Sequence, residues 1–380
     1  MNSIYLDNAA TTSIDSEVIK VMQDSMRNNF GNPSSTHQFG RKAKTAVETA
    51  RKNIASHFNI TASEIVFTAG GTEADNLILH NAVVHLGVKR IITTKIEHHA
   101  VLHTIDYLKK AHTIAVDYVH LDAFGDIDLS HLEDLLANSS EKTLVSLMLI
   151  NNEIGNILPV DEVCVLCKKH HALLHSDTVQ VIGHYPLDLQ KTPLDFMVAS
   201  AHKFHGPKGV GFAFFRKGFG IMPMFHGGGQ ERGARSSTEN VHAILGMERA
   251  LTIAIEGIEK DKKHILKQKE YFISELLKID SKIAFNGHSA HTEKGTYTIL
   301  SARFPFQNDM LLFSLDLAGI AVSGGSACQS GSSKGSHVLQ EILANTEADK
   351  TAIRFSFSKQ TTQQEIETTI LKLKELLPLS

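Results

Sequence analysis

Short apolar runs alternate along this chain with longer stretches of helical periodicity. This alternation is typical of βαβ units and predicts an α/β fold with a mostly parallel sheet. In open sheets of this kind, ligands bind at the carboxyl ends of the strands, so residues that directly follow a strand are the first candidates for function. The predicted strands of the first core lie at 65–68, 90–93, 143–150, 173–176, 196–200 and 210–215.

A long, charge-rich helical stretch at 246–278 separates these runs from the rest of the chain. A chain of 380 residues exceeds what one hydrophobic core usually organises, which favours a second, smaller domain. We expect a large domain at 15–258 and a small α/β domain made of 1–14 and 259–380. The elements predicted for the small domain are strands at 296–300 and 353–357 and helices at 307–318 and 362–376.

The charge and apolar patterns exclude several classes of protein. The 38 basic and 41 acidic residues give a net charge of −3, so nothing favours a nucleic-acid partner or an acidic membrane. The first twelve residues lack a signal-peptide pattern. The apolar stretch at 310–322 is interrupted by Ser314 and Asp316 and is shorter than the roughly 18 residues of a membrane span. We therefore expect a cytoplasmic protein.

A pair of glycines follows the predicted strand at 65–68 and precedes a helical pattern. Free N–H groups and the helix dipole at such a turn favour an anion, which Gly71 allows to approach the backbone and to which Thr72 adds a hydroxyl donor. Taken alone, the turn is better explained as an ordinary strand-to-helix turn with Thr72 as the helix N-cap. It gains meaning only if nearby residues require a phosphate.

Two charged residues follow later strands. Lys203 stands after the run 196–200, where its amine is suited to form a Schiff base with an aldehyde cofactor. Asp177 follows the run 173–176, and a carboxylate there is suited to keep a pyridinium nitrogen protonated. A surface lysine and a helix N-cap are the ordinary interpretations of each alone. Together with the anion-binding turn, they match the requirements of a pyridoxal phosphate site.

Motifs from one end of the chain to the other resemble those of NifS/IscS-type cysteine desulfurases, which are class V members of the fold-type I pyridoxal phosphate enzymes. The matching segments are YLDNAATT at 5–12, FGNPSSTH at 30–37, FTAGGTEADN at 67–76, EHHAV at 97–101, NNEIG at 151–155, HSDTVQ at 175–180, SAHKFHGPKG at 200–209, HGGGQERGARSSTEN at 226–240, SGGSACQSG at 323–331 and IRFSF at 353–357. The resemblance implies a seven-stranded, mostly parallel sheet in the large domain.

The resemblance also implies a role for individual residues. Lys203 is expected to hold the cofactor and to move the Cα proton, Asp177 to pair with the ring nitrogen, and Gln180 to bond the ring hydroxyl oxygen. His98 is expected to stack on the ring and to take part in proton transfer. The residues expected to hold the phosphate are Gly71, Thr72, Ser200 and His202, with Thr238 reaching it from the neighbouring subunit of a homodimer. Asn152 and Arg354 are expected to bind the substrate, since a guanidinium suits a carboxylate.

Cys328 lies in the Gly- and Ser-rich stretch 323–336, which we expect to be a mobile loop. In the activity that the resemblance implies, a thiolate attacks the sulfur of bound L-cysteine and releases alanine, leaving a persulfide for an acceptor protein. A nucleophile of this kind has to be exposed and mobile. The stretch departs from many relatives after Cys328: within Gln329 to His337 it lacks their Leu-Glu-Pro-Ser step, and Lys334 exchanges an acid for a base.

The other two cysteines, Cys164 and Cys167, have the spacing of a redox or metal motif, but they fall on one face of a predicted amphipathic helix at 161–171. No second pair of ligands stands at a suitable spacing, so we expect core residues and no metal. Besides a desulfurase, the sequence leaves open a selenocysteine lyase that uses the same site. It also leaves open a catalytically silent scaffold for sulfur assembly.

Overall fold

The computed structural model describes residues 3–324 and 335–377. Seven strands form its large sheet in the spatial order β2-β8-β7-β6-β5-β3-β4. Six of them run in the same direction, and β8 is antiparallel to both of its neighbours. The α/β fold with a mostly parallel, seven-stranded sheet is therefore confirmed. The strands are β2 (Ile65–Thr68), β3 (Arg90–Thr93), β4 (Ala115–Tyr118), β5 (Thr143–Ser146), β6 (Leu173–Ser176), β7 (Phe196–Ser200) and β8 (Gly211–Phe215).

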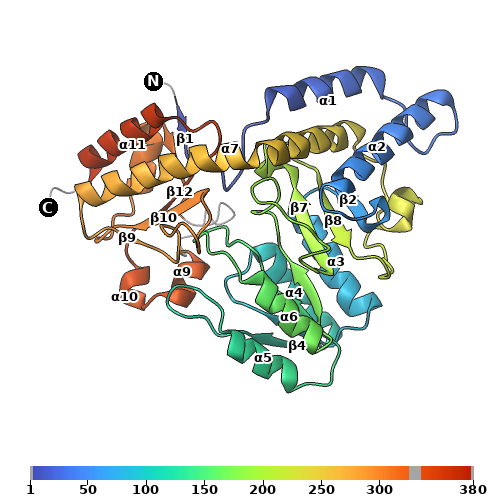
Figure 1. Cartoon of the computed structure of the whole chain (residues 1–380), viewed down its shortest axis with the longest axis horizontal. Helices are drawn as coiled ribbons and strands as arrows, with labels where there is room; N and C mark the ends of the chain where they lie inside the picture. The colour runs from blue at the N-terminus through green and yellow to red at the C-terminus, as the bar shows by residue number, and fades with distance from the viewer. Residues whose placement is uncertain (1–2, 325–334, 378–380) are drawn as a thin grey trace.

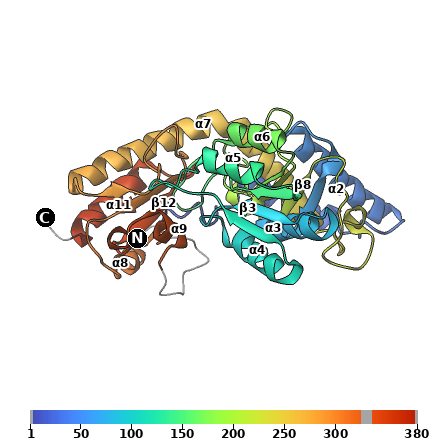
Figure 2. The same ribbon diagram turned by 90° about the horizontal axis from the view of Figure 1, so that it is seen from below.

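The sheet is covered by helices on both faces, because alternate residues of its strands point to opposite sides. On β7, Phe196 and Val198 pack with α3 (Gly71–His80) and α4 (His99–His112). Met197 and Ala199 pack on the other face, with the helices that Figure 2 shows on the opposite side of the sheet. Those helices are α2 (Gln38–Ser56), α5 (Leu129–Ala137), α6 (Val160–Lys169) and the first half of α7 (Val241–Ile279).

Helix α7 has 39 residues and runs along the length of the molecule (Figure 1). Its second half contributes Ile265, Phe272 and Leu276 to a separate hydrophobic core. That core also contains residues of a three-stranded antiparallel sheet in the order β12-β10-β9 and of a short parallel pair, β1-β11. The elements around it are β1 (Ile4–Tyr5), β9 (Ala284–Phe285), β10 (Ile299–Arg303), β11 (Ile320–Ala321), β12 (Ala352–Ser356), α8 (Leu311–Leu317) and α11 (Gln363–Leu376).

We propose that the small domain consists of residues 1–14 and 259–380, divided from the large domain within α7. Two observations support the division. Strand β1 pairs with β11, which places the start of the chain with its last third. Ile4 and Leu6 pack in the second core, together with the second half of α7. Among the described residues, the α-helices not yet named are α1 (Ser16–Asn28), α9 (His337–Ile342) and α10 (Asn345–Ala348).

Two predicted strands differ from the observed ones. The run 143–150 forms a strand only as far as Ser146, and Ile150 pairs instead with Ile157 in an isolated bridge. The strand expected at 296–300 begins at Ile299, because the backbone N–H of Thr296 bonds the carbonyl of Gly155. Across the described residues, no helix combines the length and apolar character that a membrane crossing requires.

Candidate active site

A cavity of about 190 Å³ lies where several strands of the large sheet end. Segments after β2, β3, β6 and β7 contribute to it, as does β12 of the small domain. All of the predicted site residues except Thr238 and Cys328 line this one cavity. They are Gly71, Thr72, His98, Asn152, Asp177, Gln180, Ser200, His202, Lys203 and Arg354.

The start of α3 forms one end of the cavity. Its N-cap is Gly70, with φ at 155°, and not Thr72, so the ordinary interpretation of Thr72 as the cap is wrong. A Cβ on Gly71 would lie 2.9 Å from a methyl carbon of Val179, so a larger residue would displace that side chain. Because Gly71 has no side chain, a ligand is able to come close to the N–H groups of the first turn and to the Thr72 hydroxyl. Such an arrangement attracts an anion.

His202 lies beside this helix start, and one of its ring nitrogens lacks a hydrogen-bond partner. Its Nδ1 is buried and has no hydrogen-bond partner among the described residues. Burial, together with the positive charges of Lys203 and Lys208, lowers the pKa of His202 to about 4. A buried nitrogen without a partner is costly, which indicates that a ligand with acceptor or donor atoms fits here.

Lys203 follows β7 in the short 3-10 turn Ala201–Lys203 (η3), with its side chain turned inward. Its Nζ donates hydrogen bonds to the carbonyl oxygens of Ala9 and Ala10, at 2.6 and 3.0 Å. The N-terminal segment is fixed beside this turn because the Thr12 N–H bonds the carbonyl of His202 at 2.8 Å. Lys203 is therefore not a surface lysine: the N-terminal segment, which is distant in the sequence, holds its amine at the cavity.

Asp177 directly follows β6 and is buried. Its Oδ1 accepts the N–H of Val179 at 2.9 Å within a turn, and no helix begins there. The alternative interpretation of Asp177 as a helix N-cap is therefore wrong. Gln180, three residues on, donates from Nε2 to the carbonyl of Ala9 at 3.1 Å and so faces the same N-terminal segment as Lys203.

His98 caps the N-terminus of α4, where its Nδ1 accepts the N–H of Ala100 at 3.1 Å. Burial lowers the pKa of His98, the carboxylate of Asp177 opposes that shift, and the positive charge of Lys203 adds to it. The ring is thus oriented by the helix start and is neutral at physiological pH. This excludes a solvated histidine at a strand end.

Arg354 reaches the cavity from β12, with only 3% of its side chain exposed. Its Nη1 donates to the carbonyl of Asn152 and its Nη2 to Oδ1 of Asp7, each at 2.8 Å. The buried Nε has no hydrogen-bond partner in the described part of the chain. A buried guanidinium with a spare donor at a cavity wall is suited to a carboxylate ligand, whereas a surface ion pair is excluded.

Of the two remaining predicted residues, the structure describes only Thr238, which lies outside this cavity. Thr238 is exposed and lines a separate cavity of about 160 Å³ together with Thr68, Gly209 and Arg235. Cys328 lies outside the described residues.

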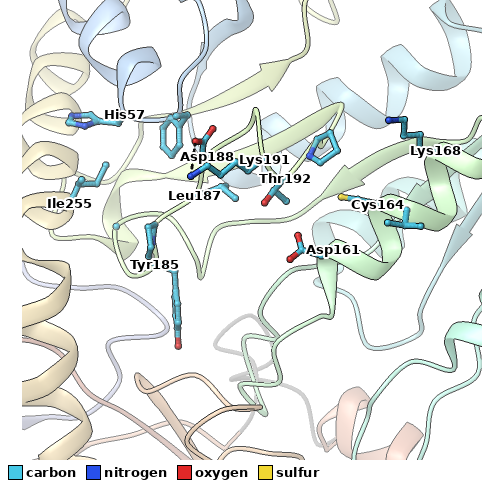
Figure 3. Close-up of a pocket in the computed structure, with 15 residues that line it drawn as sticks. His57, Asp161, Cys164, Lys168, Tyr185, Leu187, Asp188, Lys191, Thr192 and Ile255 are labelled. Atoms are coloured by element: carbon cyan, nitrogen blue, oxygen red, sulfur yellow. Dashed lines mark ion pairs between the residues drawn. The ribbon is translucent and has the colours of Figure 1, made fainter.

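A larger cavity, about 770 Å³, is a different hollow beside α6 (Figure 3). Asp161, Cys164 and Lys168 of α6 line one side of it. Cys164 and Cys167 are buried free thiols, and burial raises the pKa of Cys164 to about 12. The prediction that both are core residues is confirmed. No group of three or more metal-ligating side chains comes together in residues 3–324 and 335–377.

Some residues in the cavity wall or bonded to it had no predicted role. Asp75 lines the cavity from α3, and Asp7 pairs with Arg354. Both stand inside motifs that mark the sequence, at 67–76 and 5–12, but neither follows a strand of the large sheet. The carbonyls of Ala9 and Ala10 leave no signal in a sequence, because every residue has a carbonyl.

Comparisons with known proteins identify the family of this chain. Residues 4–369 match the model of the aminotransferase class-V family. The chain is 38% identical to the cysteine desulfurase IscS of Dictyoglomus turgidum, over 98% of this chain and 94% of that protein. A solved structure described as a NifS-like protein superposes with a TM-score of 0.90 at 38% identity, covering 98% of this chain and 99% of that one. The structure described as SspA in complex with cysteine has a TM-score of 0.79 at 29% identity, covering 95% and all of the two chains. The chain therefore belongs to the class V aminotransferase family, whose enzymes depend on pyridoxal phosphate.

Proposed function

We propose that this protein is a cysteine desulfurase that removes sulfur from L-cysteine, releases L-alanine and passes the sulfur to an acceptor protein for iron–sulfur cluster or thiolated-cofactor assembly. The observation that carries the proposal is the content of the 190 Å³ cavity. An anion-binding helix start, an acid, an inward lysine and a buried arginine line the same space. Relatives that carry the name cysteine desulfurase match nearly the whole chain.

The cavity residues fit pyridoxal phosphate. The unpartnered Nδ1 of His202 and the first turn of α3 offer donors for a phosphate, together with the hydroxyls of Thr72 and Ser200. Asp177 offers a carboxylate for the ring nitrogen and Gln180 an amide for the ring oxygen. When bound, the cofactor supplies an electrophilic aldehyde and a ring that withdraws electrons from the Cα of an amino acid.

The chain's own residues then have separate tasks. Lys203 holds the cofactor through Nζ and, once released by the substrate amine, moves the proton at Cα. Asp177 keeps the ring nitrogen protonated. His98 covers the ring and, being neutral, is able to accept or donate a proton. Arg354 and Asn152 orient the substrate carboxylate, and the spare Nε of Arg354 supplies one of the donors.

Cys328 is proposed as the nucleophile that takes the sulfur. Its thiolate attacks the sulfur atom of the bound cysteine, the carbon–sulfur bond breaks, and its electron pair stays with the carbon that becomes the methyl group of alanine. The new sulfur–sulfur bond leaves a persulfide on Cys328. The proposal rests on the sequence, because Cys328 lies outside the described residues. Cys164 and Cys167 are unsuited to this task, because burial raises the pKa of both thiols.

Mass spectrometry of the holoenzyme after incubation with L-cysteine tests the desulfurase assignment. We expect one added sulfur atom on the peptide that contains Cys328, no such adduct in Cys328→Ser, and an unchanged adduct in Cys164→Ser. An undiminished release of alanine by Cys328→Ser, with selenocysteine also processed, would instead favour a selenocysteine lyase. Purified protein that binds no cofactor would favour a scaffold.

We also infer a homodimer in which Thr238 reaches the phosphate of the neighbouring subunit. Two contacts fix the segment that carries Thr238. Arg51 and Glu231 form a buried pair with two hydrogen bonds of 2.6 and 2.7 Å, and Arg235 bonds both oxygens of Glu73 on α3. Thr238 itself is exposed on this segment, so it is available to a second chain.

We further propose a cytoplasmic location, which suits the reduced thiols of α6.

The dimer has its own test. Light scattering during size exclusion is expected to give twice the 41.7 kDa of one chain. Thr238→Val is expected to weaken binding of the cofactor by about tenfold while the protein stays dimeric, since it removes one hydrogen bond to a charged group. A monomer with full cofactor occupancy would contradict the cross-subunit role.

A further inference from the structure

Asp75 and His175 form a buried pair on the sheet side of the cavity. Asp75 lies one turn into α3 and lines the cavity, and His175 is on β6, two residues before Asp177. The side chain of Asp75 is 1% exposed and that of His175 is fully buried. Oδ1 of Asp75 and Nε2 of His175 lie 3.4 Å apart, and each is a buried atom without a hydrogen-bond partner among the described residues. Each atom is therefore the available partner of the other.

The opposite side of the imidazole is occupied by Ser146. Its Oγ lies 2.9 Å from Nδ1 of His175, within the buried centre of the sheet. When Nδ1 carries the ring proton and donates it to Ser146, Nε2 becomes an acceptor. An acceptor that faces a carboxyl oxygen at 3.4 Å needs a proton between the two, and the carboxyl group has to supply it.

The charges around Asp75 favour the same arrangement. Three carboxyl groups lie in this neighbourhood, on Asp75, Asp177 and Glu97, and the described ion pairs give Asp75 no lysine or arginine partner. Burial raises the pKa of Asp75, and the charges of Asp177 and Glu97 raise it further. Burial also lowers the pKa of His175 to about 3, so the ring stays neutral. A neutral acid that donates to a neutral imidazole satisfies both groups without a buried charge.

We propose that Asp75 is a positioning residue that carries a proton and donates it to Nε2 of His175, so that Asp177 alone presents a negative charge to the ring nitrogen of the cofactor. The proposal rests on the proposed function for the role of Asp177. The pair joins α3, whose first turn faces the phosphate, to β6, whose end carries Asp177. It thereby fixes the distance between the two ends of the cofactor site. It also keeps a second negative charge away from the carboxylate of Asp177.

Infrared and visible spectra of the holoenzyme test the protonation of Asp75. We expect the carbonyl stretch of a protonated carboxyl group at neutral pH, reduced in Asp75→Asn and unchanged in the control Asp106→Asn, whose side chain is exposed on α4. The asparagine amide is neutral and is able to donate to Nε2. Therefore, Asp75→Asn is expected to keep the pH midpoint of the cofactor absorption and to keep kcat/KM within about threefold of the wild type.

A second variant separates the hydrogen bond from mere packing. Asp75→Leu has a similar shape but no donor, so we expect it to lower kcat/KM by about tenfold and to shift the pH midpoint of the cofactor absorption. If Asp75 is ionised, Asp75→Asn will leave the infrared band intact and move that midpoint by about one pH unit, which overturns the proposal. The infrared measurement also tests the protonation of Asp75 in protein without cofactor. The absence of a cofactor band from the wild type would count against the proposed function and not against the protonated pair.

Discussion

Replacement of Lys203 by alanine is expected to abolish the release of alanine from cysteine, lowering kcat by about four orders of magnitude. The variant loses both the amine that holds the cofactor and the group that moves the Cα proton, and positioned acid–base groups alone contribute about 10²- to 10⁴-fold. The variant also loses the hydrogen bonds from Nζ to the carbonyls of Ala9 and Ala10. The purified variant is expected to lack the yellow absorption of the lysine-bound cofactor.

Two further substitutions assign this loss to the chemistry of the amine. Lys203→Arg keeps a positive charge and donors for the same carbonyls but forms no covalent bond with an aldehyde, so it is expected to be as inactive as Lys203→Ala. Lys217→Ala removes an exposed lysine after β8 and is expected to leave kcat and the absorption unchanged. An active Lys203→Arg would contradict the proposed role, because it would show that only the positive charge of Lys203 is needed.

Much of this site was predictable from the positions at which the strands end. Strands β2, β3, β6 and β7 lie where the apolar runs predict them, since all are short and almost completely buried. The residues that follow them had to meet at one edge because the strands run in the same direction. The positions of Gly71, Asp177 and Lys203 follow from this argument alone.

The strand predictions failed where a buried apolar segment does not pair with a neighbouring strand. The run 143–150 is apolar throughout, but Leu149 and Ile150 pack in a small cluster with Val181 beyond the sheet. An apolar run records that a segment is buried and not which structure buries it. The antiparallel direction of β8 is hidden for the same reason, because both faces of a central strand are apolar whichever way it runs.

Contacts between distant parts of the chain lay beyond the sequence argument. Asp7 and Arg354 meet across 347 residues, and Asp75 of α3 meets His175 of β6. No periodicity within either segment encodes such a pairing, because tertiary packing creates it. For Arg354, the family resemblance gave a role, but only the fold gives the carbonyl of Asn152 and the carboxylate of Asp7 as its neighbours.

These neighbours determine what a change at Arg354 should do. Its backbone pairs with β10 and with Ser323, and its guanidinium is held by Asn152 and Asp7. Substrate therefore meets an arginine that is already oriented, so little freedom is lost on binding. We expect Arg354→Lys, which keeps the charge but loses the planar fork, to lower kcat/KM for L-cysteine by about 100-fold, chiefly through a higher KM.

The matched control is Arg303→Lys on the neighbouring strand β10, whose side chain bonds Asn286 and pairs with Glu347, away from the cavity. It is expected to keep kcat/KM within about threefold of the wild type, since a partly exposed pair contributes little. Binding of L-alanine, followed through the cofactor absorption, separates carboxylate recognition from chemistry. Arg354→Lys is expected to weaken it by a factor similar to the rise in KM. If L-alanine binds Arg354→Lys as tightly as the wild type, the carboxylate is held elsewhere and the spare Nε of Arg354 has another partner.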